Sequence, residues 1–164
     1  MQKELTARPT EYRGIQYRSK CEAMFAMWLH LKHPDEILVE YEPEWAVDGD
    51  YVVDFVLHRP QFVQFHQTGV PIVSTHIELI EYKPSVPTVS YCSETARKLM
   101  RIAESIPDVP QVSCITMNII YGSVYTNDRG AFLCGGNKYS SIKLNWIGKY
   151  EKQIREYRFD LEHQ

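Results

Sequence analysis

Three acidic residues and one lysine have the types and the order that suit phosphodiester chemistry: Glu22, Asp54, Glu81 and Lys83. Two carboxylates favour a hard cation such as Mg²⁺ or Mn²⁺, which keeps some waters and accepts phosphate oxygens in its open positions. Such a cation neutralises charge on the phosphorane and lowers the pKa of a bound water. A lysine can position or deprotonate that water, or stabilise the transition state electrostatically. The set predicts metal-dependent phosphodiester hydrolysis, with Asp54 and Glu81 as metal ligands and Glu22 on a second metal or a metal-bound water.

Two predicted strands must carry three of these residues. Alternate residues of a strand share one face and lie about 6.5–7 Å apart, so Glu81 and Lys83 are expected on the same side of a strand over residues 72–82. Asp54 lies in the apolar run of residues 51–57, where burying a carboxylate between valines is costly without a partner. If the two strands pair, Asp54, Glu81 and Lys83 meet at one end of the sheet.

A predicted helix over residues 18–32 carries the remaining acid. Apolar residues recur at helical spacing along it, Ser19 is a suitable N-cap, and Pro34 ends it. Glu22 lies at the edge of the apolar stripe, about 100° round the helix from Cys21, so it can lean towards the sheet and still contact water.

The remaining elements follow from the same patterns. We expect strands over residues 37–42, 61–66, 111–121 and 131–134, a helix over 94–106 capped by Ser93, and a C-terminal helix over 143–158. Three basic residues fall off the apolar stripe of the 94–106 helix and are free to contact phosphates: Arg97, Lys98 and Arg101. A second basic group lies near Glu22 in the sequence and consists of Arg8, Arg13, Arg18 and Lys20.

Taken singly, each residue of the set has a simpler interpretation. Glu81 and Lys83 could be a solvated pair, and Asp54 could be a strand-end residue paired with an arginine. A glutamate two residues before a lysine recurs by chance in many chains. The ordered set, with a suitable element around each member, favours a site.

The ordered set resembles the PD-(D/E)XK nuclease superfamily, most closely the phage endonuclease I group of Holliday-junction resolvases and the endonuclease subunit of transposons. Four stretches carry the resemblance: residues 17–22, 39–43, 53–57 and 80–83. Val53 and Pro84 stand where that superfamily usually has proline and glycine.

The resemblance implies an α/β fold with a restriction-endonuclease-like core, a central mixed β-sheet flanked by helices in the order α-β-β-β-α-β. It makes Asp54, Glu81 and the backbone carbonyl of Tyr82 ligands of Mg²⁺ or Mn²⁺, Lys83 the catalytic lysine and Glu22 the acid carried by the helix. Arg18, Lys20, Arg97, Lys98 and Arg101 are the expected DNA contacts. A homodimer is expected because cutting both strands of a duplex or a junction takes two sites.

Length and composition indicate a globular protein of ordinary type. The 164 residues, 44% hydrophobic and 24% charged, are expected to form one domain. Within it, residues 1–16 are a flexible arm, 58–76 an insertion and 122–164 a C-terminal extension. Four widely spaced cysteines and the lack of a signal or membrane segment favour a cytoplasmic setting, which is the host cytoplasm for a phage protein. The net charge of −3 is unusual for a nucleic-acid binder, so binding depends on local basic groups.

Two other functions stay open. One is a catalytically silent module of the same fold that binds nucleic acid or protein. The other is a nuclease subunit that cuts only beside a partner such as a transposase. DNA and RNA are not distinguished, and neither is the preferred DNA structure.

Overall fold

The computed structural model describes residues 8–33, 37–65, 71–107, 112–147 and 151–159. Ten strands and two helices lie in these ranges. In chain order they are β1 (Thr10–Tyr12), β2 (Ile15–Tyr17), α1 (Lys20–Lys32), β3 (Leu38–Tyr41), β4 (Val47–Asp48), β5 (Tyr51–Val52), β6 (Phe55–Phe65), β7 (Pro71–Lys83), α2 (Val89–Ser105), β8 (Val112–Asn127), β9 (Gly130–Ile147) and β10 (Glu151–Phe159).

One mixed sheet organises the molecule. Its strands lie in the order β10-β9-β8-β7-β6-β3, and β7 and β8 are parallel while the other neighbours are antiparallel. A parallel pair needs a crossover, and α2 supplies it between β7 and β8. The predicted α/β class with a mixed central sheet and flanking helices is therefore confirmed.

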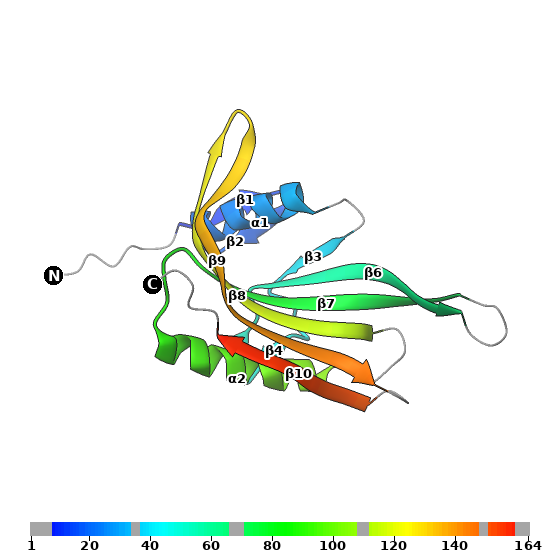
Figure 1. The fold of residues 1–164 in the computed structure, drawn as a ribbon. Helices are drawn as coiled ribbons and strands as arrows, with labels where there is room; N and C mark the ends of the chain where they lie inside the picture. Colours follow the sequence, from blue (N-terminus) through cyan, green and yellow to red (C-terminus); the bar gives the residue numbers. More distant parts are fainter. Residues whose placement is uncertain (1–7, 34–36, 66–70, 108–111, 148–150, 160–164) are drawn as a thin grey trace.

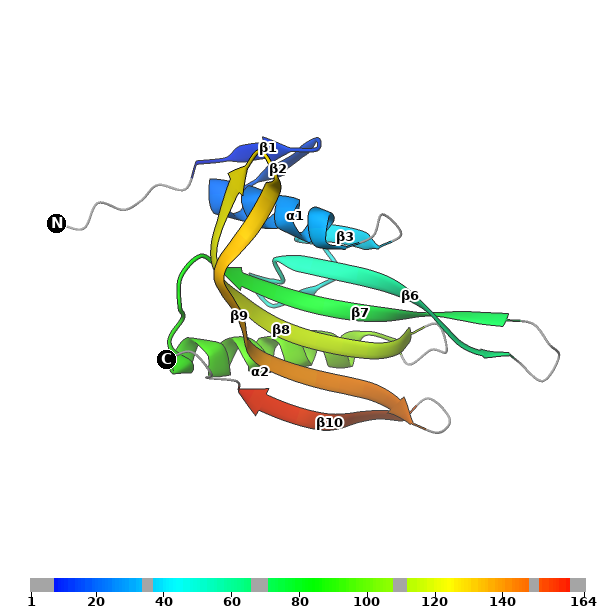
Figure 2. The ribbon, with the colours of Figure 1, turned by 45° about the horizontal axis from the view of Figure 1, so that its top comes forward.

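The two helices cover opposite faces of this sheet (Figures 1 and 2). Side-chain alternation along β7 explains the division. Ile80 and Tyr82 belong to the core beneath α1, whereas Leu79 belongs to the core beneath α2. Glu81 and Lys83 continue the face of Leu79, so the sheet directs them to the side of α2.

Helix α1 forms as its sequence predicts. The Ser19 side chain accepts a hydrogen bond from the Glu22 N–H at 3.2 Å, which confirms the N-cap. Phe25 stacks on Tyr82 with the ring centroids 4.0 Å apart and the planes 14° apart. This contact fastens the helix that carries Glu22 to the strand that carries Glu81.

Helix α2 begins five residues before the predicted start, at Val89 rather than residue 94. Its N-cap is Thr88, whose side chain accepts from the Tyr91 N–H at 3.1 Å, so the prediction of Ser93 as the cap is wrong. The predicted apolar stripe is confirmed, and Cys92 extends it by one turn. The earlier start brings Tyr91 into the first turn.

The predicted helix over residues 143–158 is wrong, because β9 includes residues 143–147 and β10 includes residues 151–158. Ile142, Leu144 and Trp146 alternate with polar residues, a period of two that indicates a strand. The short strand predicted over 131–134 is one part of β9. Part of the predicted C-terminal extension, β9 and β10, thus belongs to the main sheet.

The other predicted strands are present with shifted bounds. The 51–57 strand is divided into β5 and the start of β6, and Asp54 lies between the two. Residues 58–65 and 71–76 of the predicted insertion are the distal parts of β6 and β7. Residues 10–16 of the predicted arm, together with Tyr17, form the β1–β2 hairpin beside α1, and residues 1–7 lie outside the described part. Within the described ranges, neither helix has the length and apolarity that a membrane crossing needs.

Candidate active site

A cavity of about 330 Å³ lies where five segments meet: the start of α1, the residue after β3, the β5–β6 junction, the end of β7 and the first turns of α2. All four residues predicted to do chemistry line it, together with two of the five predicted DNA contacts. These six are Arg18, Glu22, Asp54, Glu81, Lys83 and Lys98.

Asp54 is fixed by the backbone on both sides of the site. Its Oδ2 accepts a hydrogen bond from the Tyr82 N–H at 2.8 Å, and its carbonyl accepts from the Glu42 N–H at 2.9 Å.

The Asp54 residue is only 4% exposed. Burial raises the pKa of Asp54 well above its usual range, the charge of Glu81 raises it further, and the Tyr82 N–H opposes both. An added cation would relieve this cost. Tyr82 contacts Asp54 through its N–H, and the role of its carbonyl stays a prediction.

Glu81 is equally buried, at 4%, and both of its oxygens accept hydrogen bonds from tyrosines. The Tyr51 hydroxyl donates to Oε2 at 2.5 Å, and the Tyr91 hydroxyl donates to Oε1 at 2.8 Å. Burial raises the pKa of both tyrosines, with the charge of Glu81 as the next cause, so both hydroxyls remain donors at neutral pH.

Lys83 lies beside this carboxylate. Its Nζ is 3.7 Å from Oε1 of Glu81 and 5.0 Å from the centroid of the Tyr91 ring. Burial lowers the pKa of Lys83, but the Tyr91 hydroxyl and the carboxylates of Glu81 and Asp54 raise it above its ordinary value. Lys83 is therefore an ammonium at neutral pH, a state that favours electrostatic stabilisation over proton abstraction.

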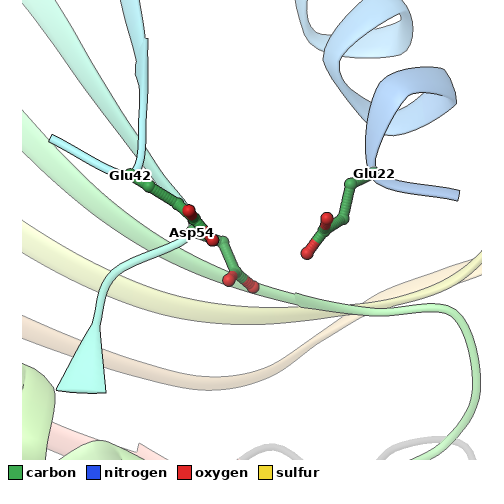
Figure 3. A group of neighbouring side chains, drawn as sticks. All are labelled: Glu22, Glu42 and Asp54. Carbon is green, nitrogen blue, oxygen red and sulfur yellow. The ribbon is translucent and has the colours of Figure 1, made fainter. Parts of the chain in front are cut away.

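A second acidic group lies on the other side of Asp54. Oxygens of Glu22, Glu42 and Asp54 all lie within 4.8 Å of one another, and Figure 3 shows Glu22 reaching from α1 towards the other two. The Tyr41 hydroxyl donates to Oε2 of Glu22 at 2.9 Å, and burial raises the pKa of Tyr41 to about 12. Oxygen donors of this kind suit Mg²⁺ or Mn²⁺.

Arg18 offsets part of the negative charge of this group. Its Nη2 forms an ion pair with Glu42 and lies 3.9 Å from Glu22 and 3.8 Å from Asp54. The guanidinium is still 65% exposed, so it remains open to solvent and to a phosphate.

Glu42 is a carboxylate of the site that the sequence interpretation missed, although residues 39–43 are one of the stretches that carry the family resemblance. Its backbone is left-handed, with φ of 44°, a conformation that costs a residue other than glycine about 1–3 kcal/mol. The hydrogen bond from its N–H to Asp54 holds it there. An acidic residue directly after β3, next to Tyr41, was the available signal.

The other predicted DNA contacts are scattered. Lys98 lies 5.3 Å from the centroid of the Tyr51 ring and lines the cavity. Arg101 instead pairs with Asp48 at 2.9 Å. Arg97 and Lys20 are exposed on α2 and α1 and do not line the cavity. The structure thus brings Arg18 and Lys98 to the site and leaves the other three outside it.

Comparison with known proteins does not identify this chain. No protein-family model matches it, and no curated protein matches it significantly. Among solved structures, it is similar to the sex pheromone staph-cAM373 precursor, with a TM-score of 0.39 and 14% identity. The match covers 86% of this chain but 49% of that protein, so this chain spans about half the length of the other. A likeness at this level carries no assignment of function.

Proposed function

We propose that this protein is a metal-dependent DNA endonuclease that hydrolyses phosphodiester bonds. One observation carries the proposal: Glu22, Asp54, Glu81 and Lys83, which lie on separate segments, line one cavity. Chance pairs of a glutamate and a lysine are common, but convergence of all four at a buried acidic site is not an ordinary surface arrangement.

The donor set of the cavity suits Mg²⁺ or Mn²⁺. Asp54 and Glu81 would hold the ion, and Glu22 with Glu42 would hold a second ion or orient a metal-bound water. When bound, the ion supplies an activated water and neutralises the charge of the phosphate. The raised pKa of Asp54 supports this fit, because a buried acid beside a second carboxylate is costly without a cation.

The chain's own residues would supply the remaining electrostatics. Lys83, held as an ammonium beside Glu81, would stabilise negative charge on the transferring phosphate. Arg18 and Lys98 line the cavity and would contact backbone phosphates on either side of the cleavage position. Because the net charge is −3, these local cations would carry the DNA affinity. A homodimer that acts on branched or junction DNA would place two such sites on one substrate.

Cleavage assays with Lys83→Ala beside the wild type test this function. Supercoiled plasmid, linear duplex, single strand and a four-way junction would be incubated with Mg²⁺, Mn²⁺ or EDTA. The expected result is metal-dependent cutting by the wild type that Lys83→Ala loses by at least a hundredfold, with DNA binding retained. Lys32→Ala is the matched control, since Lys32 lies near Trp28, outside the cavity lining. A fully active Lys83→Ala protein would exclude this mechanism.

Arg18 gives specific support to a second candidate, a catalytically silent binding module of the same fold. Its guanidinium already offsets part of the negative charge of Glu22, Glu42 and Asp54, so that group could be structural. Metal binding separates the two candidates. Thermal stability that does not respond to Mn²⁺ would favour the silent module. A protein that binds Mn²⁺ but cuts nothing would instead favour a nuclease subunit that needs a partner.

A further inference from the structure

Two tyrosines from different elements converge on Glu81. Tyr51 belongs to the short strand β5, and Tyr91 belongs to the first turn of α2. Their hydroxyls donate to different oxygens of the same carboxylate, at 2.5 Å and 2.8 Å. Filling a core would not require these hydroxyls, since phenylalanine has the same ring.

We infer that Tyr51 and Tyr91 are positioning residues with separate tasks. Tyr51 holds the Glu81 carboxylate in place for the metal, and Tyr91 holds the Lys83 ammonium against that carboxylate. This inference rests on the proposed nuclease function and deepens it.

The case for Tyr51 starts from the crowding of carboxylates. Glu81 is 4% exposed, and its charge is repelled by that of Asp54. A carboxylate has about four lone-pair positions, so one tyrosine on each oxygen leaves room for a metal. Tyr51 is the donor to Oε2, whereas Oε1 faces Tyr91 and Lys83. Loss of the Tyr51 hydroxyl would therefore release the oxygen of Glu81 that Lys83 does not contact.

The case for Tyr91 starts from the cap of α2. Thr88 accepts a hydrogen bond from the Tyr91 N–H at 3.1 Å, which fixes the backbone that carries the ring. The ring then lies 5.0 Å from Lys83 Nζ, and the hydroxyl donates to Oε1 of Glu81, the oxygen that lies 3.7 Å from the same Nζ. The lysine side chain is 39% exposed, so without the hydroxyl that fixes Oε1 of Glu81 it can move towards solvent.

Phenylalanine substitutions separate the two tasks, because they keep the ring and remove only the hydroxyl. Mn²⁺ affinity would be measured by calorimetry, and kcat would be measured at saturating Mn²⁺. For Tyr51→Phe we expect metal affinity to fall roughly 10- to 100-fold, with kcat within a few-fold of wild type. For Tyr91→Phe we expect metal affinity within about threefold of wild type and kcat at least tenfold lower. Tyr125→Phe, at an exposed position outside the cavity lining, is the matched control.

One measurement does not depend on cleavage activity, so it tests the positioning roles even if the proposed function is wrong. Acetylation of Lys83 by an activated ester, followed by mass spectrometry and normalised to Lys32, reports how tightly the ammonium is held. Tyr91→Phe should raise the Lys83 rate several-fold, and Tyr51→Phe should leave it unchanged. If the wild type cuts nothing but these shifts in affinity and acetylation occur, the positioning roles stand and the proposal that this protein cuts DNA by itself falls.

Two results would overturn the inference. In the first, both variants lose thermal stability but keep wild-type metal affinity, kcat and Lys83 acetylation, so the hydroxyls are only structural. In the second, both variants show the same combined loss of affinity and kcat, so the tasks are not separate.

Discussion

The guanidinium of Arg18 lies 3.8 Å from the buried carboxylate of Asp54, and the same nitrogen contacts Glu42 and lies near Glu22. An arginine that the sequence assigned to DNA therefore shares a group of carboxylates with the proposed metal. The guanidinium and the metal act on the same carboxylates, so the presence of either cation should reduce the stabilisation that the other provides.

Replacing Arg18 with methionine should lower the stability of the metal-free protein by about 1 kcal/mol, because three carboxylates then lose their cation. The same change should enlarge the rise in melting temperature that Mn²⁺ causes, since the metal no longer competes with the guanidinium. Melting curves across a Mn²⁺ titration measure both effects. Lys20→Met, which removes an exposed charge at the start of α1, should change neither. A smaller Mn²⁺ response in Arg18→Met would contradict the competition.

Asp54→Asn should stabilise the metal-free protein at neutral pH. Because the folded-state pKa of Asp54 is raised above 3.8, the folded protein binds more protons than the unfolded chain as the pH rises above that value. The stability of the wild type therefore falls as the pH rises from 3.8 to the raised pKa of Asp54. Above that pKa the stability stays at its lowered value. Asparagine has no such loss and keeps an oxygen for the Tyr82 N–H.

Melting curves of wild type and Asp54→Asn between pH 4 and pH 8 in EDTA check this sign. The advantage of the variant should grow with pH and reach the order of 1 kcal/mol. Mn²⁺ at pH 7 should reverse the order, because only the wild type keeps the carboxylate. An asparagine variant that is less stable at every pH would show that the charge of Asp54 is satisfied without metal.

The parts of the site that follow from local sequence were predictable. The capped helix that carries Glu22 and the apolar strand that ends in Glu81 and Lys83 each have a clear period, and the structure contains both. Tyr51 and Tyr91 were not predictable in this way, because their contacts with Glu81 span 30 and 10 residues and depend on how β5 and α2 dock. The C-terminal strands were misread because aromatic and apolar residues at 142–147 fit a helical period as well as a strand period.

Glu42→Gln should weaken Mn²⁺ binding if this missed residue is a ligand or orients a bound water. The change keeps the size of the side chain and the strained backbone, so the effect reports the charge. We expect an affinity loss of roughly tenfold. Glu44→Gln, at an exposed glutamate two residues along, is the control. Equal Mn²⁺ affinities for the two variants would exclude Glu42 from the metal site.

Phe25→Ala tests whether the packing of α1 on the sheet assembles the site. Phe25 is fully buried and stacks on Tyr82, the neighbour of Glu81, while Glu22 lies one helical turn before it. Removing the ring should cost about 3–5 kcal/mol in the free energy of unfolding, measured by urea denaturation. The loosened helix should also hold Glu22 less well, so the Mn²⁺ response should shrink in protein that remains folded. Leu31→Ala, on the same helix but 58% exposed, should cost less than about 0.5 kcal/mol and leave the response intact.

If Phe25→Ala unfolds entirely, Phe25→Leu offers the milder change. A Phe25→Leu protein that is less stable yet binds Mn²⁺ as tightly as the wild type would show that Glu22 is positioned by its N-terminal cap and Tyr41 alone.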